Sequence, residues 1–416
     1  MSKYKISPLA PERFPDMPPL AGFDMATAEA GVKYQGRTDL WVLRGQVGTQ
    51  VAGVFTKNQM PGAPIVWSRQ ALTEAQNSGA PCLVVVNSGN ANVFTGKAGD
   101  DAVRATAESA ANVFGARAET VQVASTGVIG ERLDASRITA QLPDMAGRMK
   151  ADGWADAAAA IMTTDTYPKG ASAAAKIDGT SVQINGIAKG SGMIAPDMAT
   201  MLAYVATDAK LSQSVLQDLL AEATQTTFNA ITVDSDTSTS DTLLLLASGA
   251  AGGPEDITAA SDPRLDDFKR ALHGVLQDLA LQVVRDGEGA TKLVEINISG
   301  AADNESARAI GLSLANSPLV KTAIAGEDAN WGRIIMAVGK SGQAADRDKL
   351  SIAFGPHLVA ENGAIAADYT EEKGAAYMRQ NELILNVDVG VGTGLAKVWT
   401  CDLTHGYIDI NADYRS

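Results

Sequence analysis

Short apolar stretches bounded by turn residues recur along the whole chain of 416 residues. Residues 83–86 and 243–247 are examples, and they are far shorter than the roughly 20 apolar residues of a membrane span. Such stretches are typical of buried strands, and segments with helical spacing of apolar residues alternate with them. No repeat of about 20 to 50 residues is present. The pattern therefore predicts a mixed fold of sheets and helices, in the α/β or α+β class.

The same patterns place the individual elements. Helices are expected at residues 65–76, 100–114, 154–162, 212–226 and 265–284, and strands at residues 81–87, 121–124, 201–208, 242–248 and 292–299. Two hairpins are predicted, one within residues 40–56 with Gly45 and Gly48 between its halves, and one within residues 174–188 that turns at Asp178-Gly179. Asp100 is expected to cap its helix, the S-G-N-A-N cluster after residue 87 to form a turn, and residues 249–263 to form a surface loop.

Composition narrows the class of protein. A net charge of −14 argues against nucleic acid or an anionic membrane surface as the main partner, because both require a basic face. The polar, Pro-rich N-terminus does not resemble a secretory signal. Cys82 and Cys401 are far apart and form no C-x-x-C motif, which indicates free thiols and a cytoplasmic location. With three histidines in the chain, His-based catalytic triads have few candidates.

One segment suggests a different nucleophile. Residues 189–202 read K-G-S-G-M-I-A-P-D-M-A-T-M-L, so a Gly-rich loop leads directly into Thr200 at the start of an apolar strand. A threonine whose preceding peptide bond is cut carries a free α-amine, which can act as its own general base because its pKa is about 8. A surface loop followed by an ordinary strand has the same local pattern, so this segment alone does not decide between the two readings.

Further motifs lie at separated places along the chain. They are S-T-G at 125–127, M-T-T-D-T at 162–166, D-S-D-T-S-T at 234–239, D-G-E-G-A-T-K at 286–292, N-W-G-R at 330–333 and the terminal N-A-D-Y-R-S. Together with the loop before Thr200, they make the chain closely resemble the ornithine acetyltransferase family, also called the bifunctional glutamate N-acetyltransferases. The resemblance runs from S-P-L-A-P near the N-terminus to the last residue.

This resemblance implies a mixed sandwich of sheets and helices in a self-processing protein that resembles the N-terminal-nucleophile enzymes. The cut would fall between Ala199 and Thr200 and leave an α chain of residues 1–199 and a β chain of residues 200–416, both of which build one active site. The small side chain of Ala199 leaves its carbonyl open to attack by the Thr200 hydroxyl, and Gly190 and Gly192 would let the loop adopt strained conformations. The family also implies an assembly of two α and two β chains.

Further site residues follow from the resemblance. Thr126 and Gly127 match the oxyanion hole of the family, although an ordinary Thr-Gly turn at a strand end would look the same. Lys189 would bind a substrate carboxylate, and Glu288 a substrate ammonium group.

The remaining substrate contacts of the family match Thr163, Asn411 and Ser416. Each also has a simpler interpretation, since Thr163 could cap a helix and a chain terminus is usually frayed. The chain departs from the family pattern at Asp197, where Asn is frequent, and at Ser235 and Ser240, where Gly and Asn are frequent. These departures affect the expected loop geometry and acceptor preference, and they leave the reaction class intact.

The implied reaction moves acetyl from N2-acetyl-L-ornithine to L-glutamate by a ping-pong mechanism through an acetyl ester of Thr200. It requires no metal and no nucleotide cofactor. Some members of the family also use acetyl-CoA to acetylate glutamate, and the sequence contains no separable CoA-binding motif that decides this point. Three alternatives stay open: a related acyltransferase of secondary metabolism, a self-processing Thr-type aminopeptidase or amidohydrolase, and a non-catalytic protein that binds amino acids.

Overall fold

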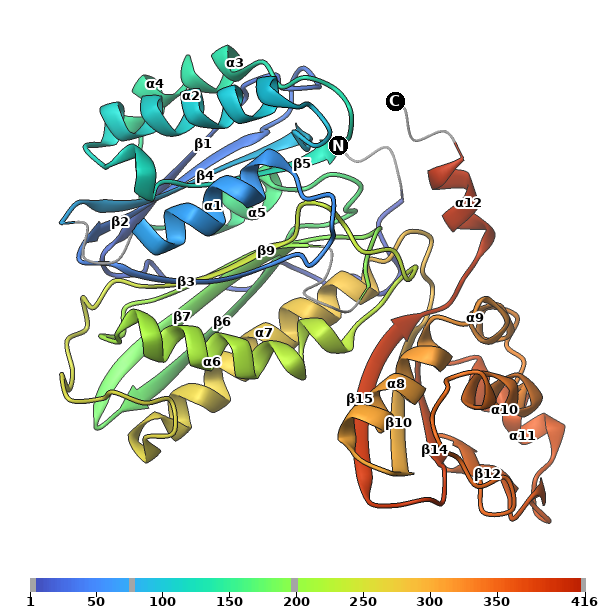
Figure 1. Ribbon diagram of the computed structural model, residues 1–416. Helices are drawn as coiled ribbons and strands as arrows, with labels where there is room; N and C mark the ends of the chain where they lie inside the picture. The colour runs from blue at the N-terminus through green and yellow to red at the C-terminus, as the bar shows by residue number, and fades with distance from the viewer. Residues whose placement is uncertain (1–4, 75–78, 196–200, 413–416) are drawn as a thin grey trace.

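A computed structural model describes residues 5–74, 79–195 and 201–412. The chain forms a layered body of two sheets with helices outside them, and a smaller C-terminal unit with a sheet of its own (Figure 1). The mixed sheet-and-helix fold predicted from the sequence is confirmed.

The N-terminal sheet has the strand order β1-β2-β4-β5, in which β4 and β5 run parallel and the other pairs antiparallel. Its strands are β1 (Phe23–Ala28), β2 (Leu40–Val47), β4 (Pro81–Asn90) and β5 (Gln122–Val128). Helices cover its outer face and its β5 edge: α1 (Ala63–Glu74), α2 (Lys97–Phe114), α3 (Ala135–Thr139) and α4 (Leu142–Ala146), with a short 3-10 helix at Ala118–Thr120 (Figure 1). Ser68 of α1 exchanges hydrogen bonds with the backbone of Val123, which ties this helix to the edge strand.

The central sheet has the order β3-β9-β8-β7-β6, in which β8 and β9 are parallel neighbours. Its strands are β3 (Gln50–Phe55), β6 (Lys169–Ile177), β7 (Thr180–Lys189), β8 (Leu202–Thr207) and β9 (Thr242–Ala247). The outer face is covered by α6 (Gln213–Gln225) and α7 (Asp266–Arg285), with 3-10 helices at Phe228–Ala230 and Pro263–Leu265, and α5 (Trp154–Ala160) is packed between the two sheets (Figure 1).

Strands β8 and β9, in the middle of the central sheet, are almost entirely apolar and buried, and β8 shows the reason. Leu202, Tyr204 and Ala206 pack in the core between the two sheets, whereas Ala203 and Val205 pack against the outer helices. Successive side chains of a strand point to opposite faces, so a strand with a core on both sides needs apolar residues at every position.

The C-terminal unit contains a sheet of order β13-β12-β11-β14-β10-β15. Its strands are β10 (Leu293–Ala301), β11 (Ser351–Phe354), β12 (His357–Glu361), β13 (Ala364–Ile365), β14 (Glu382–Asp388) and β15 (Gly394–Cys401), and its helices are α8 (Asn304–Ala315), α9 (Pro318–Ala325), α10 (Trp331–Gly339) and α11 (Glu371–Met378). Trp399 of β15 joins the core under the central sheet and forms a β-bridge with Ile231. The last helix, α12 (His405–Asn411), leads away from this unit and back towards the layered body (Figure 1).

The prediction of a hairpin within residues 40–56 is wrong, although both of the expected strands form. Strand β2 pairs with β1 and β4, whereas β3 pairs with β9 in the other sheet. Trp41 and Val51, one from each strand, are buried in the same core between the sheets. The two strands therefore face each other across that core, and the chain crosses from sheet to sheet at Gly48, which has a φ of 92°.

Two smaller predictions, the turn after residue 87 and the helix cap at Asp100, are also wrong. Strand β4 continues through Ser88 to Asn90, where a turn was expected, because these residues pair with β5. Asp100 lies in the first turn of α2, and Gly96 occupies the capping position. The hairpin turning at Asp178-Gly179 is confirmed, with φ values of 48° and 82°, the positive values that a two-residue type I′ turn requires at both central positions.

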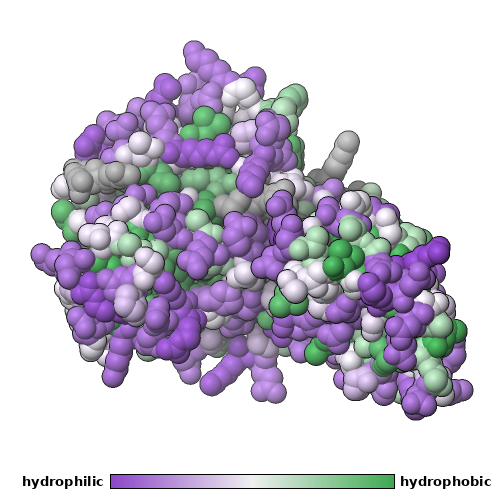
Figure 2. Space-filling model, turned by 60° about the horizontal axis from the view of Figure 1, so that its bottom comes forward, coloured by the Kyte–Doolittle hydropathy of each residue, from purple (hydrophilic) through white to green (hydrophobic). Residues whose placement is uncertain are grey.

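The face of the molecule in Figure 2 is mostly hydrophilic, with apolar side chains distributed among polar ones. In the parts of the chain that the structure describes, we find no helix that combines the length and the apolar character needed to cross a bilayer. Cys82 and Cys401 are free, as the sequence predicted, and the structure shows that both are buried.

Candidate active site

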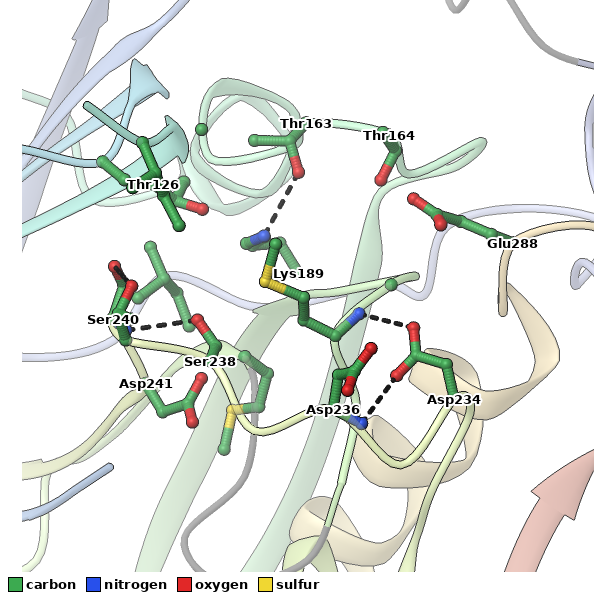
Figure 3. A pocket seen from close by; sticks show the side chains of 18 of the residues that line it. Thr126, Thr163, Thr164, Lys189, Asp234, Asp236, Ser238, Ser240, Asp241 and Glu288 are labelled. Atoms are coloured by element: carbon green, nitrogen blue, oxygen red, sulfur yellow. Dashed lines mark hydrogen bonds between the residues drawn. The ribbon is translucent and has the colours of Figure 1, made fainter. Parts of the chain in front are cut away.

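A cavity of about 170 Å³ lies where the two sheets of the body meet the segment after α7 and helix α12. Six residues predicted from the sequence line this one cavity: Thr126, Gly127, Thr163, Lys189, Glu288 and Asn411. Ala199, Thr200 and Ser416 lie outside the described residues, while Met201, the next residue after Thr200, lines the cavity. Figure 3 shows Thr126 on one side of Lys189 and Glu288 on the other.

Gly127 lies on β5 opposite Gly89 of β4, close to the backbone of that strand. Its φ is 131°, and an added Cβ would lie 2.6 Å from the backbone nitrogen of Asn90 and still closer to the carbonyl carbon of Gly89. No side chain fits in this space, so the backbone geometry requires glycine at this position. The preceding residue, Thr126, is 6% exposed and presents its hydroxyl at the cavity.

Lys189 ends strand β7 and meets the first residue of β8, because its register partner is Leu202. Its ammonium group donates a hydrogen bond of 3.2 Å to the hydroxyl of Thr163 (Figure 3). Burial lowers the pKa of Lys189, and the nearby carboxylate of Asp165 acts in the opposite direction.

Glu288 is 7% exposed, and its carboxylate accepts a hydrogen bond of 2.6 Å from the amide of Asn411. Burial raises the pKa of Glu288, and the hydrogen bond from Asn411 counteracts this effect. Gly192 makes room for this carboxylate, since an added Cβ would lie 2.5 Å from its Oε2 atom. Gly192 has no positive φ, so the strained conformation expected for it from the sequence is absent. Glycine is required here because of the close packing against Glu288.

The acidic segment of residues 234–241, which begins with the D-S-D-T-S-T motif, supplies residues that the sequence did not assign to the site. Asp234 accepts hydrogen bonds from the backbone amides of Met193, at 2.7 Å, and Ile194, at 2.9 Å, and so holds the loop that follows β7. Asp241 is 3% exposed and lines the cavity, and its Oδ2 atom has no hydrogen-bond partner among the described residues. Burial raises the pKa of both carboxyl groups.

Sequence reasoning also missed Thr164 and Tyr407, which line the same cavity. The Thr164 hydroxyl is 2.6 Å from that of Ser191, and the Tyr407 hydroxyl is 3.4 Å from Asp234. Thr164 stands beside Thr163 in the M-T-T-D-T motif, and this neighbourhood was the signal available for it. In the described ranges, no three His, Cys, Asp or Glu side chains are grouped so that they could hold a metal ion.

The arrangement combines three chemical properties in one small space. A hydroxyl and a backbone N–H, from Thr126 and Gly127, are suited to binding a developing oxyanion. A cation, Lys189, and an anion, Glu288, are suited to the two charged groups of an amino acid. Residues on both sides of position 200 contribute to this cavity.

Comparison with known proteins places the chain in a family. The model of the ArgJ family matches residues 24–416. The "Arginine biosynthesis bifunctional protein ArgJ" of Gluconobacter oxydans is 56% identical over 411 residues, covering 99% of this chain and 96% of the relative. The protein of the same name from Agrobacterium fabrum is 56% identical over 413 residues, covering 99% of each chain.

Among solved structures, a chain of the ArgJ protein of Bacillus halodurans is 42% identical, with a TM-score of 0.49, and the match covers 51% of this chain and 99% of that one. A chain of the ornithine acetyltransferase of Mycobacterium tuberculosis complexed with ornithine is 34% identical, with a TM-score of 0.35, and the match covers 43% and 93%. The family match over nearly the whole chain, with relatives of this identity, confirms the resemblance inferred from the motifs: the chain belongs to the ArgJ family, together with these bifunctional proteins of arginine biosynthesis.

Proposed function

We propose that this protein transfers acetyl from N2-acetyl-L-ornithine to L-glutamate in two steps, through an acetyl ester on Thr200. The observation that carries the proposal is that Thr126, Gly127, Lys189 and Glu288 line one cavity together with Met201, the residue bonded to Thr200. The curated relatives, named for arginine biosynthesis, support the choice of these substrates.

The proposal begins with self-processing. The hydroxyl oxygen of Thr200 attacks the carbonyl carbon of Ala199, the carbon–nitrogen bond between the two residues breaks, and the nitrogen takes up the hydroxyl proton. Water then hydrolyses the ester, which leaves a carboxylate on Ala199 and restores the Thr200 hydroxyl. The resulting chains are residues 1–199 and residues 200–416, and the free α-amine of Thr200 then serves as the base that activates its hydroxyl.

In the transfer itself, Lys189 binds the carboxylate of the substrate, and Glu288, positioned by Asn411, binds an ammonium group. Thr163 and Ser416 complete the set of substrate contacts. The acetyl carbonyl faces Thr126 and Gly127, and each of these oxyanion donors contributes about 3 to 4 kcal/mol to the stability of the tetrahedral intermediate. Ornithine leaves, and glutamate takes the acetyl group from Thr200.

The proposal includes no resident metal or cofactor. It includes acetyl-CoA as a second acetyl donor, which would agree with the word bifunctional in the names of the relatives. It also includes an assembly of two α and two β chains. A cytoplasmic location is part of the proposal, and the two free cysteines support it, because a reducing compartment keeps thiols unpaired.

The test is to trap the acetylated intermediate. Incubation with N2-acetyl-ornithine alone should add one acetyl group to the fragment that begins at Thr200, as measured by mass spectrometry of the denatured protein. Glutamate should then remove this acetyl group much faster than water does, and a Thr200→Ala variant should acquire none. Release of acetate at the same rate with and without glutamate would instead identify a hydrolase.

A further inference from the structure

Three buried side chains beside the cavity form a line of alternating charge. The ammonium group of Lys169, the first residue of β6, lies 2.6 Å from a carboxylate oxygen of Asp165 and 2.6 Å from one of Asp286. All three side chains are completely buried. Asp286 directly follows α7 and also accepts hydrogen bonds from the backbone and the hydroxyl of Thr166. Buried charges are costly unless they are paired, so this arrangement needs a structural or functional reason.

Asp165 connects this line to Lys189. One of its carboxylate oxygens accepts a hydrogen bond of 2.6 Å from the backbone N–H of Gly190, the residue that follows Lys189. The other accepts a hydrogen bond of 2.9 Å from the backbone N–H of Thr163, whose own hydroxyl accepts from the Lys189 ammonium group. A single carboxylate therefore fixes the backbone beside Lys189 and the backbone of the residue that Lys189 contacts.

The groups around Lys189 act on its pKa in opposite directions, and the overall effect is a lowered pKa. Burial lowers the pKa of Lys189, and the charge of Lys169 lowers it further. The carboxylates of Asp165, Asp241 and Glu288 face Lys189 from three other segments and raise its pKa, and Asp165 has the largest effect of the three. Burial alone would raise the pKa of Asp165, but the ammonium groups of Lys169 and Lys189 hold it well below its usual range. Asp165 is therefore ionised across the physiological range.

We propose that Asp286, Lys169 and Asp165 form a positioning relay that holds Lys189 in place and positively charged for the carboxylate of the bound amino acid. Asp286 orients Lys169, Lys169 orients Asp165, and Asp165 orients Lys189 through the backbone of Gly190. This inference rests on the function proposed above in one respect, namely that Lys189 binds the substrate carboxylate.

The relay is tested with Asp165→Asn, which keeps the size of the side chain and removes its charge. The titration of the Lys189 ammonium group is followed by NMR in unliganded protein with labelled lysine, and the signal is assigned by its loss in Lys189→Arg. We expect the midpoint to fall by about one to three pH units in Asp165→Asn, the usual influence of a close opposite charge. An unchanged midpoint would overturn the proposal. This measurement does not depend on acetyl transfer, so it remains decisive if the proposed function fails.

Kinetics give a second readout. In Asp165→Asn, the KM for N2-acetyl-ornithine should begin to rise at a lower pH than in the wild type, with little change in kcat. Tyr167→Phe is the matched control, because it removes a buried hydrogen bond to Gln282 in the same segment without changing any charge. If Asp165→Asn instead lowers kcat without shifting the pH profile, and Tyr167→Phe does the same, Asp165 has a merely structural role and the proposal is overturned.

Two further variants complete the design. Asp286 contacts Lys169, which contacts Asp165, so Asp286→Asn removes a more distant charge and should shift the Lys189 midpoint in the same direction by a smaller amount. It replaces Asp165→Asn if that variant does not fold, and a wild-type midpoint in Asp286→Asn would then overturn the relay. In Asp165→Asn/Lys189→Arg, the pH dependence added by the first substitution should disappear, because a guanidinium group stays charged.

Discussion

Glu288 shows how burial of a single residue sets the pH range of the site. Its pKa is raised by burial, so its carboxyl group takes up a proton at a higher pH than an ordinary glutamate does. Only the ionised form attracts an ammonium group.

Binding of the substrate ammonium group should therefore weaken as the pH falls through this raised pKa, and it should be fully present above it. We expect KM for N2-acetyl-ornithine to rise on the acidic side, and the measurement is a pH profile of kcat/KM. In Glu288→Gln, binding should be weaker at every pH, and the decrease of kcat/KM on the acidic side should be absent. If both proteins show the same decrease of kcat/KM on the acidic side, a group other than Glu288 causes it.

Thr126 lines the cavity, and we propose that its hydroxyl binds the oxyanion of the tetrahedral intermediate. Thr126→Val keeps the shape of the side chain and removes one donor, so acetylation of Thr200 and discharge by glutamate should both slow by a common factor of roughly 100 to 1,000. Rapid-quench measurements of the two half-reactions provide the check. A variant that slows one half-reaction and leaves the other unchanged would contradict a shared oxyanion hole.

At the scale of elements, the pairing of β4 and β5 builds the wall of the cavity that carries Thr126. The register shifts between Gly89 and Asn90, opposite Gly127, and the two backbones come into direct contact there. This contact fixes where the N–H of Gly127 and the hydroxyl of Thr126 lie.

Gly127→Ala should consequently destabilise the protein by about 2 to 4 kcal/mol, since it adds a steric overlap to the strain of a positive φ. Gly130→Ala is the matched control, because Gly130 also has a positive φ, 86°, but has nothing within 4 Å of an added Cβ. It should cost only about 1 kcal/mol. Denaturant unfolding of the two variants measures the difference, and equal losses would mean that β4 moves aside without cost.

At the scale of the whole molecule, the central sheet joins the two sides of the proposed cut. Strands β3, β6 and β7 precede residue 199, whereas β8 and β9 follow residue 200. The pairs β7–β8 and β3–β9 both link one side to the other, and the buried pair of Lys169 and Asp286 does the same. Separation of the two fragments would break the sheet and expose its core.

We therefore expect the fragments 1–199 and 200–416 to elute together under native conditions and to separate only under denaturing conditions. Intact mass and gel filtration of the same preparation test this. Thr200→Ala should remain a single chain with the same fold. Cleavage of that variant at the same bond would rule out self-processing by Thr200.

Much of this protein follows from the sequence alone. Helices α1, α5, α6 and α7 and strands β8, β9 and β10 lie close to their predicted positions, because local periodicity and turn residues specify elements of this kind. The turn at Asp178-Gly179 is local in the same sense. The scattered motifs identified the family and named six residues that now line one cavity, since each motif carries its own chemistry wherever it is placed.

Only the tertiary structure shows the strand pairings and charge contacts that join residues far apart in the sequence. Strands β2 and β3 are neighbours in sequence, yet they belong to different sheets because Trp41 and Val51 share one core. Asp165, Lys169 and Asp286 look like ordinary charges in the sequence, and their mutual contacts arise only when β6 and the end of α7 meet. Pairing and burial are properties of surfaces brought together from far along the chain, so local pattern determines the elements, and their packing determines the pairing and the charge environment of the site.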